Sequence, residues 1–423
     1  MKHIAIVGFG GAGYSAAKEA RMQAPDAAID VYTDITVGPY NPMLTTYYVK
    51  GAIPYDTLFP FGSLEQITRD LRLNVSRGVP VVGLDAPKKQ LELADGTRRT
   101  YDEILISTGA SAFMPPVPGI DLPGVLKMRT VDDAQALKQL VDAGTIKTGL
   151  VIGASWVGIK VAEDFFERGI DCTLVDGAGW IFPVAAFQET ALRIQRDLEK
   201  KGIHLGFSQM LSRIEQTESG QLSAVMENGN RYCADVVVVC IGIRPNVGFL
   251  KNSGLKIGRG IQVDTAMRTN FEGIYAAGDC CESPELQSHS HKHVGVWANA
   301  QNQGRVAGAN MAGGKMVFEE NILINLAHYM HMDFLSIGDI TTCRPEDEVY
   351  EFENDQYYIR GVKQGRDIRC INIYGPAESN GILRSGFVKS LAPGQGFDTR
   401  ARAALKASGY PNSFINFLGG SNL

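Results

Sequence analysis

Three glycines near the start of the chain have the spacing of a phosphate-binding turn. Gly8, Gly10 and Gly13 form a G-x-G-x-x-G motif. In such a motif the first glycine allows a tight turn, the second lets the backbone approach a pyrophosphate, and the third lets a helix pack closely on a strand. Free N–H groups at the helix N-terminus would then bind the phosphates. The spacing therefore predicts a dinucleotide site.

The residues around this motif fit the strand–turn–helix unit that such a site needs. The apolar run 4–7 predicts a buried parallel strand, and residues 14–23 predict a helix. A second strand is expected over 29–34, where Asp34 can accept hydrogen bonds from ribose hydroxyls. We prefer this interpretation to a glycine-rich turn without a ligand, because a strand precedes the motif and a helix and an acid follow it.

The same pattern recurs in the middle of the chain with one change. An apolar run at 150–152 leads into Gly153 and Gly158, and Asp176 ends the next expected strand. Ser155 stands where the middle glycine is expected, so we predict that binding of a dinucleotide here is weakened or absent. If a nicotinamide cofactor binds, Asp176 favours NADH, because it can bond the ribose 2′-OH and would repel a 2′-phosphate.

Composition narrows the class of protein. A chain of 423 residues predicts two or three domains, and 44% hydrophobic with 21% charged residues is ordinary for a globular protein. The net charge of -5 gives no basic surface for nucleic acid, and no apolar run is long enough to span a membrane. The first turn leaves no room for a signal peptide, and seven cysteines without framework spacing fit a reducing cytoplasm.

The remaining elements suggest where the domains divide. A hairpin is expected over 91–100, a buried strand ends at Ser107–Ala110, and the proline-rich run 115–118 is a candidate boundary. From residue 317 the pattern changes to short strands at 334–340, 349–352, 357–362 and 368–374, with a helix at 399–408. This last region is predicted to be a mostly antiparallel α+β domain.

Four landmarks in order resemble a known family. They are the Gly8 motif, residues 106–109, the Gly153 motif and residues 275–279, Tyr-Ala-Ala-Gly-Asp. Together they resemble the two-dinucleotide, pyridine nucleotide-disulfide oxidoreductase superfamily. The closest resemblance is to ferredoxin, rubredoxin and nitrite reductase flavoproteins without a redox-active disulfide. It covers roughly residues 1–315, and the segments 40–44, 243–246 and 297–305 add to it.

The resemblance implies an α/β fold with two Rossmann-like dinucleotide-binding domains and a C-terminal α+β domain. It implies a discontinuous FAD-binding domain at 1–114 and 245–316, an inserted NAD(P)H-binding-like domain at 115–244, and an interface-type domain at 317–423. Asp279 would accept hydrogen bonds from the ribityl chain, and the helix near Ala298 would point its N-terminus at the flavin. The predicted cofactor-binding residues, for FAD and NADH, are Gly8, Gly10, Gly11, Ala12, Gly13, Asp34, Thr108, Gly109, Gly278, Asp279, Trp297, Ala298, Gly153, Ser155, Trp156, Gly158, Asp176 and Gly242.

The chain departs from its relatives at the residues expected to act near the flavin. Relatives usually carry a glutamate at the position of Lys160 and pair it with a lysine where this chain has Thr46. We predict that Lys160 supplies a cation near the flavin, and the alternative is a solvated helix residue. His289, His291 and His293 would face one way on an extended strand. The resemblance implies that His291 or His293 lies near the flavin, and the alternative is that they are surface polar residues. No carboxylate or cysteine spacing supports a metal site there.

Cysteine placement argues against a dithiol mechanism. Disulfide-reducing relatives use active cysteines in the first domain, whereas Cys172 is the first cysteine of this chain. Cys280 and Cys281 follow the Gly-Asp turn and are expected to be packing residues.

The function predicted is that of an FAD-dependent oxidoreductase, an enzyme that passes electrons from NADH through flavin to a protein or small-molecule acceptor. The alternative is a flavoprotein dehydrogenase or electron-relay subunit of a complex, with a degenerate NAD site, that oxidises an organic substrate. A third hypothesis is a flavin-bearing binding or signalling protein. We expect the protein to be cytoplasmic and to act as a homodimer or as a subunit of a larger complex.

Overall fold

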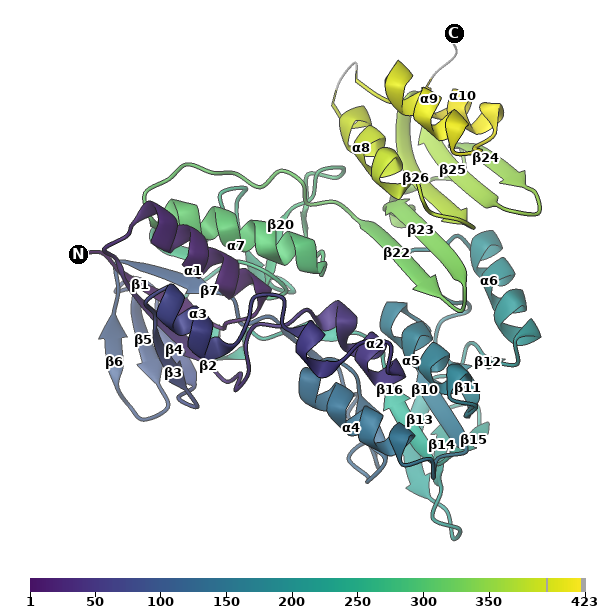
Figure 1. Cartoon of the computed structure of the whole chain (residues 1–423), viewed down its shortest axis with the longest axis horizontal. Helices are drawn as coiled ribbons and strands as arrows, with labels where there is room; N and C mark the ends of the chain where they lie inside the picture. Colours follow the sequence, from purple (N-terminus) through teal and green to yellow (C-terminus); the bar gives the residue numbers. More distant parts are fainter. Residues whose placement is uncertain (393–394, 420–423) are drawn as a thin grey trace. The chain divides into compact units, whose positions relative to one another are not determined.

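The computed structural model describes residues 1–392 and 395–419, drawn in Figure 1. The chain divides into two compact units. The first contains Met1–Phe113, Arg129–Ala134 and Ile243–Asn321, and the second contains Met114–Met128, Gln135–Gly242 and Ile322–Leu423. The second unit therefore joins the expected NAD(P)H-binding-like segment to the C-terminal region. The division into three domains stays a prediction.

A parallel sheet forms the centre of the first unit, with the strand order β19–β7–β1–β2–β3. Ile4, Ala5 and Ile6 of β1 are completely buried, as expected for a strand covered on both faces. The strands are β1 (His3–Val7), β2 (Ala28–Thr33), β3 (Asn74–Arg77), β7 (Glu103–Ile106) and β19 (Ile274–Ala276). The predicted hairpin over 91–100 is confirmed by the antiparallel pair β5 (Gln90–Leu93) and β6 (Arg98–Thr100), which β4 (Val81–Asp85) extends.

Helices α1 (Gly11–Gln23) and α7 (Trp297–Met311) pack side by side in this unit (Figure 1). Their contact depends on small residues. A Cβ atom at Gly304 or Gly308 would lie 2.1 or 2.3 Å from the backbone oxygen of Ala12 or Ala16, respectively. Because the two glycines are four residues apart, they lie on the same face of α7. This close packing brings the start of α7 beside the start of α1.

Shorter elements complete the first unit. Two helices, α2 (Thr45–Lys50) and α3 (Leu64–Asp70), follow β2, and α4 (Val131–Asp142) begins in this unit. The remaining strands are β8 (Ala110–Ala112), β17 (Ile243–Pro245), β18 (Ile261–Gln262), β20 (Cys281–Pro284) and β21 (His291–Lys292).

The second unit contains another parallel sheet, in the order β12–β11–β10–β16–β9. Its strands are β9 (Val125–Lys127), β10 (Thr148–Ile152), β11 (Asp171–Val175), β12 (His204–Gly206) and β16 (Val236–Val239). Helix α5 (Trp156–Glu167) follows β10, and α6 (Gln188–Lys200) follows β11. Strands β13 (Leu211–Gln216), β14 (Leu222–Met226) and β15 (Arg231–Ala234) form an antiparallel sheet. The repeated opening pattern therefore forms a second strand–turn–helix unit.

The C-terminal part of this unit is an antiparallel sheet, in the order β22–β23–β26–β25–β24. Its strands are β22 (Ile324–Tyr329), β23 (Met332–Gly338), β24 (Glu348–Glu353), β25 (Tyr358–Gln364) and β26 (Asp367–Tyr374). Helices α8 (Asn380–Ser390), α9 (Thr399–Ala407) and α10 (Asn412–Gly419) share its buried core, where Leu335 and Ile371 cluster with Phe387 and Phe414. The predicted antiparallel α+β character is confirmed, although the sequence did not indicate β22, α8 or α10.

Candidate functional site

The first glycine-rich turn has the geometry that its motif predicts. Gly8 has a left-handed φ of +93°, and a Cβ atom there would lie 2.3 Å from the Ser107 backbone oxygen. A Cβ atom at Gly13 would lie 2.2 Å from the Gly8 oxygen. Side chains are therefore excluded at both positions by the fold itself.

The space in front of α1 suits a negatively charged group. Gly10 is the residue before the first helical turn, and a Cβ atom there would meet no atom within 4 Å. The first turn of α1 carries no acidic side chain, so the partial positive charge of its N-terminus is not neutralised locally. Trp297 adds a donor, because its Nε1 lies 2.9 Å from the Cβ position of Gly11 and is buried without a partner among the described residues. These features fit a pyrophosphate, the group that FAD would place here.

Trp297 is held by a row of aromatic rings. Its ring stacks on Phe61 at 5.9 Å between centroids, and Phe61 stacks on Tyr14 at 4.1 Å. Trp297 is the first residue of α7, and Ala298 follows it in a first turn that also lacks acidic side chains. The predicted residues at the starts of α1 and α7 are thus brought together.

Asp279 lies in a cluster that the sequence did not reveal. The Arg129 guanidinium makes an ion pair with the Asp279 carboxylate at 2.5 Å and donates to the Ala110 backbone oxygen at 3.1 Å. Arg129 precedes a reciprocal cap at the start of α4, where Thr130 and Asp133 bond each other's backbone N–H groups. That T-x-x-D pattern marks the helix start, but it does not indicate the carboxylate that Arg129 reaches.

The histidines do not line one strand, so that expectation is wrong. His289 has a left-handed φ of 55°, and only His291 and Lys292 belong to β21. His291 Nε2 lies 3.1 Å from the Val263 backbone oxygen, whereas His293 Nε2 lies 3.0 Å from that of Asp279. His293 thus joins the Asp279 cluster, and burial lowers the pKa of its imidazole. Catalytic roles for His291 and His293 stay predictions.

The segments that follow β7 and β17 are hydrogen-bonded to each other beside this cluster. Thr108 Oγ1 donates to the Asn246 backbone oxygen at 2.7 Å, and Asn246 Nδ2 donates to the Thr108 oxygen at 3.0 Å. Gly109 follows with a φ of +64°. The two landmark segments therefore form one hydrogen-bonded edge, next to the Gly278–Asp279 turn.

Cys280 and Cys281 are completely buried or nearly so. Burial raises the pKa of the Cys280 thiol to about 11 and that of Cys281 well above its ordinary value. A thiolate nucleophile is disfavoured at both positions, which supports their interpretation as packing residues.

The second glycine-rich turn repeats the backbone of the first. Gly153 has a φ of +113°, and a Cβ atom at Gly158 would lie 1.8 Å from the Gly153 backbone oxygen. Ser155 precedes the first turn of α5, with Trp156 as its first residue, and the Ser155 Oγ donates to the Cys240 backbone oxygen at 3.2 Å. The serine hydroxyl is therefore engaged by the end of β16. Gly242, farther along the same edge, has a φ of +115°.

Asp176 is oriented toward this turn by backbone amides. Its Oδ2 accepts from the Ala154 N–H at 2.6 Å, and its Oδ1 accepts from the Ala178 N–H at 2.7 Å. Asp34, its counterpart in the first unit, is exposed. The second acid is thus fixed beside the glycine-rich turn by backbone amides of the protein.

Lys160 is not a solvated helix residue, so that alternative is wrong. Its side chain is 13% exposed, and its ammonium group pairs with the Glu163 carboxylate. The ammonium also donates to the His328 backbone oxygen at 2.9 Å, and Glu163 accepts from the Met330 N–H at 2.8 Å. The pair thereby bonds α5 to the tip of the β22–β23 hairpin. Thr46 is buried in α2, and the predicted catalytic roles of Lys160 and Thr46 remain untested.

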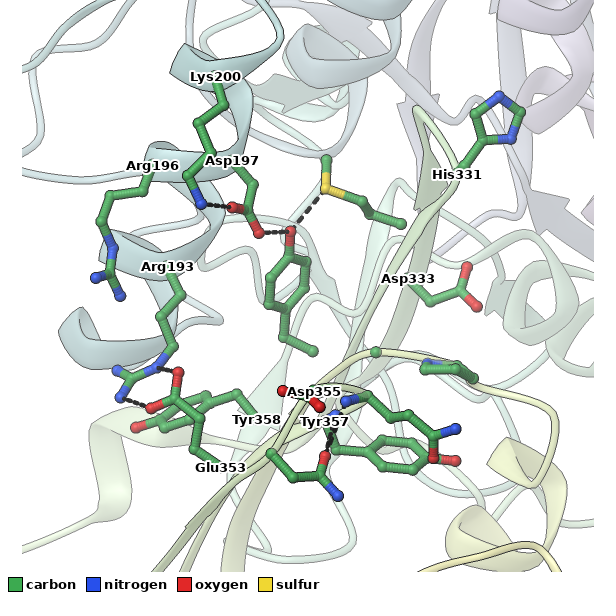
Figure 2. A pocket seen from close by; sticks show the side chains of 16 residues that line it. Arg193, Arg196, Asp197, Lys200, His331, Asp333, Glu353, Asp355, Tyr357 and Tyr358 are labelled. Carbon is green, nitrogen blue, oxygen red and sulfur yellow. Dashed lines mark hydrogen bonds and ion pairs between the residues drawn. The ribbon is translucent and has the colours of Figure 1, made fainter.

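A separate cavity of about 540 Å³ lies between α6 and the ends of the C-terminal strands (Figure 2). Arg193 bonds Glu353 through two nitrogens at 3.0 and 2.5 Å. Lys200 pairs with Asp197 at 2.9 Å, and the Tyr374 hydroxyl donates to the same carboxylate at 2.8 Å. These charges are paired within the walls of the cavity, and no predicted site residue lines it.

The described part of the chain offers neither a metal-binding cluster nor a membrane-spanning helix. Within residues 1–392 and 395–419, no group of three or more histidine, cysteine, aspartate or glutamate side chains could hold a metal ion. No helix in the same ranges combines the length and the apolar character needed to cross a membrane.

Three proteins of known activity are similar to this chain in sequence. An NADH oxidase from Methanocaldococcus jannaschii is 31% identical over 318 residues, covering 74% of this chain and 70% of that one. A rubredoxin-NAD(+) reductase from Alcanivorax borkumensis is 30% identical, with 70% and 75% covered. The epsilon subunit of an NADH-dependent phenylglyoxylate dehydrogenase from Aromatoleum evansii is 28% identical, with 86% and 84% covered.

A solved structure and a family model complete the comparison. The water-forming NADH oxidase from Lactobacillus brevis shares the fold with a TM-score of 0.85 at 22% identity, over 96% of this chain and 99% of that one. The predicted α/β fold class is thereby confirmed. The model of the pyridine nucleotide-disulphide oxidoreductases matches residues 2–304. The predicted enzyme class, oxidoreductase, and the predicted cofactors, FAD and NADH, are those of this family. The chain belongs to the pyridine nucleotide-disulphide oxidoreductase family.

Proposed function

We propose that the protein is an NADH-dependent flavoprotein reductase, which passes electrons from NADH through FAD to a protein or small-molecule acceptor. The observation that supports it most is the presence of two complete strand–turn–helix units in one chain. Each has a first glycine in the left-handed region and a third glycine that admits no side chain. Two dinucleotides of different kinds are what a reductase of this type needs.

The first unit would hold FAD. The amides at the start of α1 and the Trp297 indole N–H would donate to the pyrophosphate. Asp34 would accept from the adenosine ribose, and Asp279 from the ribityl chain. Arg129 holds the Asp279 carboxylate in place through its ion pair. When bound, FAD supplies the two-electron redox chemistry.

The second unit would hold NADH. The start of α5 would bind its pyrophosphate, and Asp176 is already turned toward that loop to accept from the adenosine ribose. The Ser155 hydroxyl is bonded to the end of β16, so only its Cβ atom adds bulk relative to a glycine. This geometry supports a working site in preference to a degenerate one.

We propose the electron acceptor as a class of molecule, a small electron-transfer protein or a small molecule. The similarity to a rubredoxin-NAD(+) reductase supports a small electron-transfer protein, and the similarity to an NADH oxidase supports a small molecule such as oxygen. We propose that the protein acts as a homodimer or as a subunit of a complex. Its cytoplasmic location is proposed because none of the seven cysteines, all in the described part of the chain, forms a disulfide bond.

A second candidate function is that of an electron-relay subunit. The similarity to a phenylglyoxylate dehydrogenase subunit extends over 86% of the chain, more than the 74% and 70% of the two reductase-type relatives above. In such a role the flavin would exchange electrons with a partner subunit that oxidises an organic substrate. The NAD site of the second unit would then be degenerate, and the electrons would come from the partner subunit rather than from NADH.

The anaerobic absorbance spectrum tests the proposal. The purified protein should be yellow with bound FAD, and a small excess of NADH should bleach the flavin band within seconds. An added acceptor should restore the band at a rate that depends on acceptor concentration. A flavin that stays oxidised with NADH, although dithionite reduces it, would contradict the reductase and favour the relay subunit.

A further inference from the structure

A methionine that has no part in the predicted site lies directly against the second nucleotide unit. Gly177 follows Asp176 at the end of β11, and a Cβ atom at Gly177 would lie 2.2 Å from the Met210 Sδ. The φ of Gly177 is not in the left-handed region, so its backbone would accept a side chain. The Met210 thioether fills the space beside Gly177. This contact, and not the backbone conformation, therefore leaves no room for a side chain at Gly177.

Backbone hydrogen bonds fix this arrangement. Gln209 N donates to the Asp176 oxygen at 2.8 Å, and Ser208 N donates to the Ala178 oxygen at 2.7 Å. On the other side, the Met210 oxygen accepts from Glu227 N at 2.8 Å. The segment that carries the methionine is thus held beside the segment that carries the ribose-binding acid.

The Met210 side chain is also accessible to a ligand. It is 55% exposed, although it is large and apolar. In a Rossmann unit the acid at the end of the second strand binds the adenosine ribose, so the adenine ring lies close by. A thioether is flexible and polarisable and packs well on an aromatic ring. Met210 is placed to offer that surface.

The two segments beside Asp176 carry no side chain that would pair with a 2′-phosphate. Residues 177–180 are Gly-Ala-Gly-Trp and residues 208–210 are Ser-Gln-Met, so neither segment has a lysine or arginine. An arginine near this acid is a common way to accommodate NADPH. A long side chain at Gly177 would have to displace Met210.

We propose that Met210 is a specificity-determining residue of the pyridine nucleotide site. Its thioether packs on the adenosine of NADH and occupies the place where a cation for a 2′-phosphate would stand. This inference rests on the proposed function, because it requires NADH to bind at the Gly153 turn.

Titration calorimetry on the FAD-loaded protein tests this with two fragments, ADP-ribose and 2′,5′-ADP. Met210→Ala should weaken ADP-ribose binding about fivefold, the loss of one apolar ring contact. Met210→Arg should strengthen 2′,5′-ADP binding about tenfold or more, because it adds a cation beside the ribose. Met22→Ala removes another exposed methionine, at the end of α1, and should change neither affinity. Thermal melts establish that each variant is folded.

The outcomes separate this inference from the function on which it rests. If the parent protein binds ADP-ribose and both Met210 variants bind the two fragments with the parent's affinities, the role of Met210 alone is overturned. Parent protein that binds neither ADP-ribose nor NADH would overturn the nucleotide site and the inference with it.

Discussion

The two glycine-rich turns have the same backbone but different side chains. Gly8 and Gly153 both have left-handed φ angles, +93° and +113°. At the third glycine, Gly13 or Gly158, a Cβ atom would collide with the carbonyl oxygen of the first, at 2.2 or 1.8 Å. These four glycines are therefore required by folding, whatever the turn binds.

The middle position is different. Gly10 and Ser155 each directly precede a helix. Gly10 has φ and ψ angles of -81° and -159°, and Ser155 has -113° and -171°. Both are extended conformations that any residue can adopt. The backbone thus does not require glycine at either site. Substitutions at this position therefore test what each turn binds without a cost from backbone strain.

The largest effect on cofactor binding is expected at Gly10. Gly10→Val should weaken FAD binding by 100-fold or more, roughly 2.7 kcal/mol, because its side chain would occupy the place of the pyrophosphate. The fold should survive, since a Cβ atom there meets no protein atom within 4 Å. FAD content per chain and the dissociation constant of the refilled apoprotein are the measurements.

The matched control for this variant is Gly248→Val. Gly248 also has open space around its Cβ position and a φ outside the left-handed region, but it is remote in sequence from the turn. That variant should retain full FAD. Full FAD occupancy in the Gly10→Val variant would contradict the assignment of the first turn as the FAD site.

The helices after the turns differ as well, which leads to a second prediction. Two residues beyond the third glycine, α1 has Ser15 whereas α5 has Lys160, paired with a glutamate whose side chain is 3% exposed. Lys160→Met should destabilise the protein by about 3 kcal/mol, because Glu163 is left buried without its cation. A lower melting temperature is the expected result.

Two further measurements decide what Lys160 does. The double variant Lys160→Met/Glu163→Gln should recover much of the lost stability, since it leaves no buried charge unpaired. If Lys160 also lies at the flavin, Lys160→Met should lower the flavin midpoint potential, where roughly 30 mV corresponds to about 1.4 kcal/mol. An unchanged potential with a lowered melting temperature would leave only the structural role.

Sequence patterns were sufficient for features whose causes are local. The spacing of Gly8 and Gly13 predicted the turn because strand, turn and helix follow one another directly. Arg129 was missed because its partner Asp279 is 150 residues away in the chain. Nothing in the T-x-x-D pattern at the start of α4 specifies that long-range contact.

The histidine prediction failed for a different physical reason. Their alternation suggested an extended strand, but the buried Glu285 carboxylate accepts from the Gln287 and Ser288 N–H groups at 3.0 and 2.7 Å. This side chain replaces a strand partner and bends the chain into a turn, where His289 takes a left-handed conformation. A polar pattern without an apolar face does not define a strand.

The acids of the two units allow a third prediction, with a smaller effect. Asp176 is fixed by two amides, so Asp176→Asn should weaken NADH about tenfold and reduce the preference for NADH over NADPH. Stopped-flow flavin reduction with each nucleotide measures both. Asp171→Asn, at the other end of β11 and exposed, should leave both rates unchanged. Faster reduction of the parent by NADPH than by NADH would show that Asp176 does not bind the ribose.

The smallest effect is expected at Ser155, the middle position of the second turn. Ser155→Gly makes the second turn match the first and should strengthen NADH binding about threefold, roughly 0.6 kcal/mol, because one Cβ atom is removed beside the pyrophosphate. The cost in stability should be only a few tenths of a kcal/mol, since the serine hydroxyl does not cap α5. Ser155→Ala is the sharper control, because it keeps the Cβ atom and removes only the bond to the Cys240 oxygen. If Cβ bulk limits the site, alanine should bind NADH no better than serine, and glycine alone should improve it. Equal affinities in all three proteins would mean that the pyrophosphate does not approach this position, and that the second turn binds its nucleotide differently from the first.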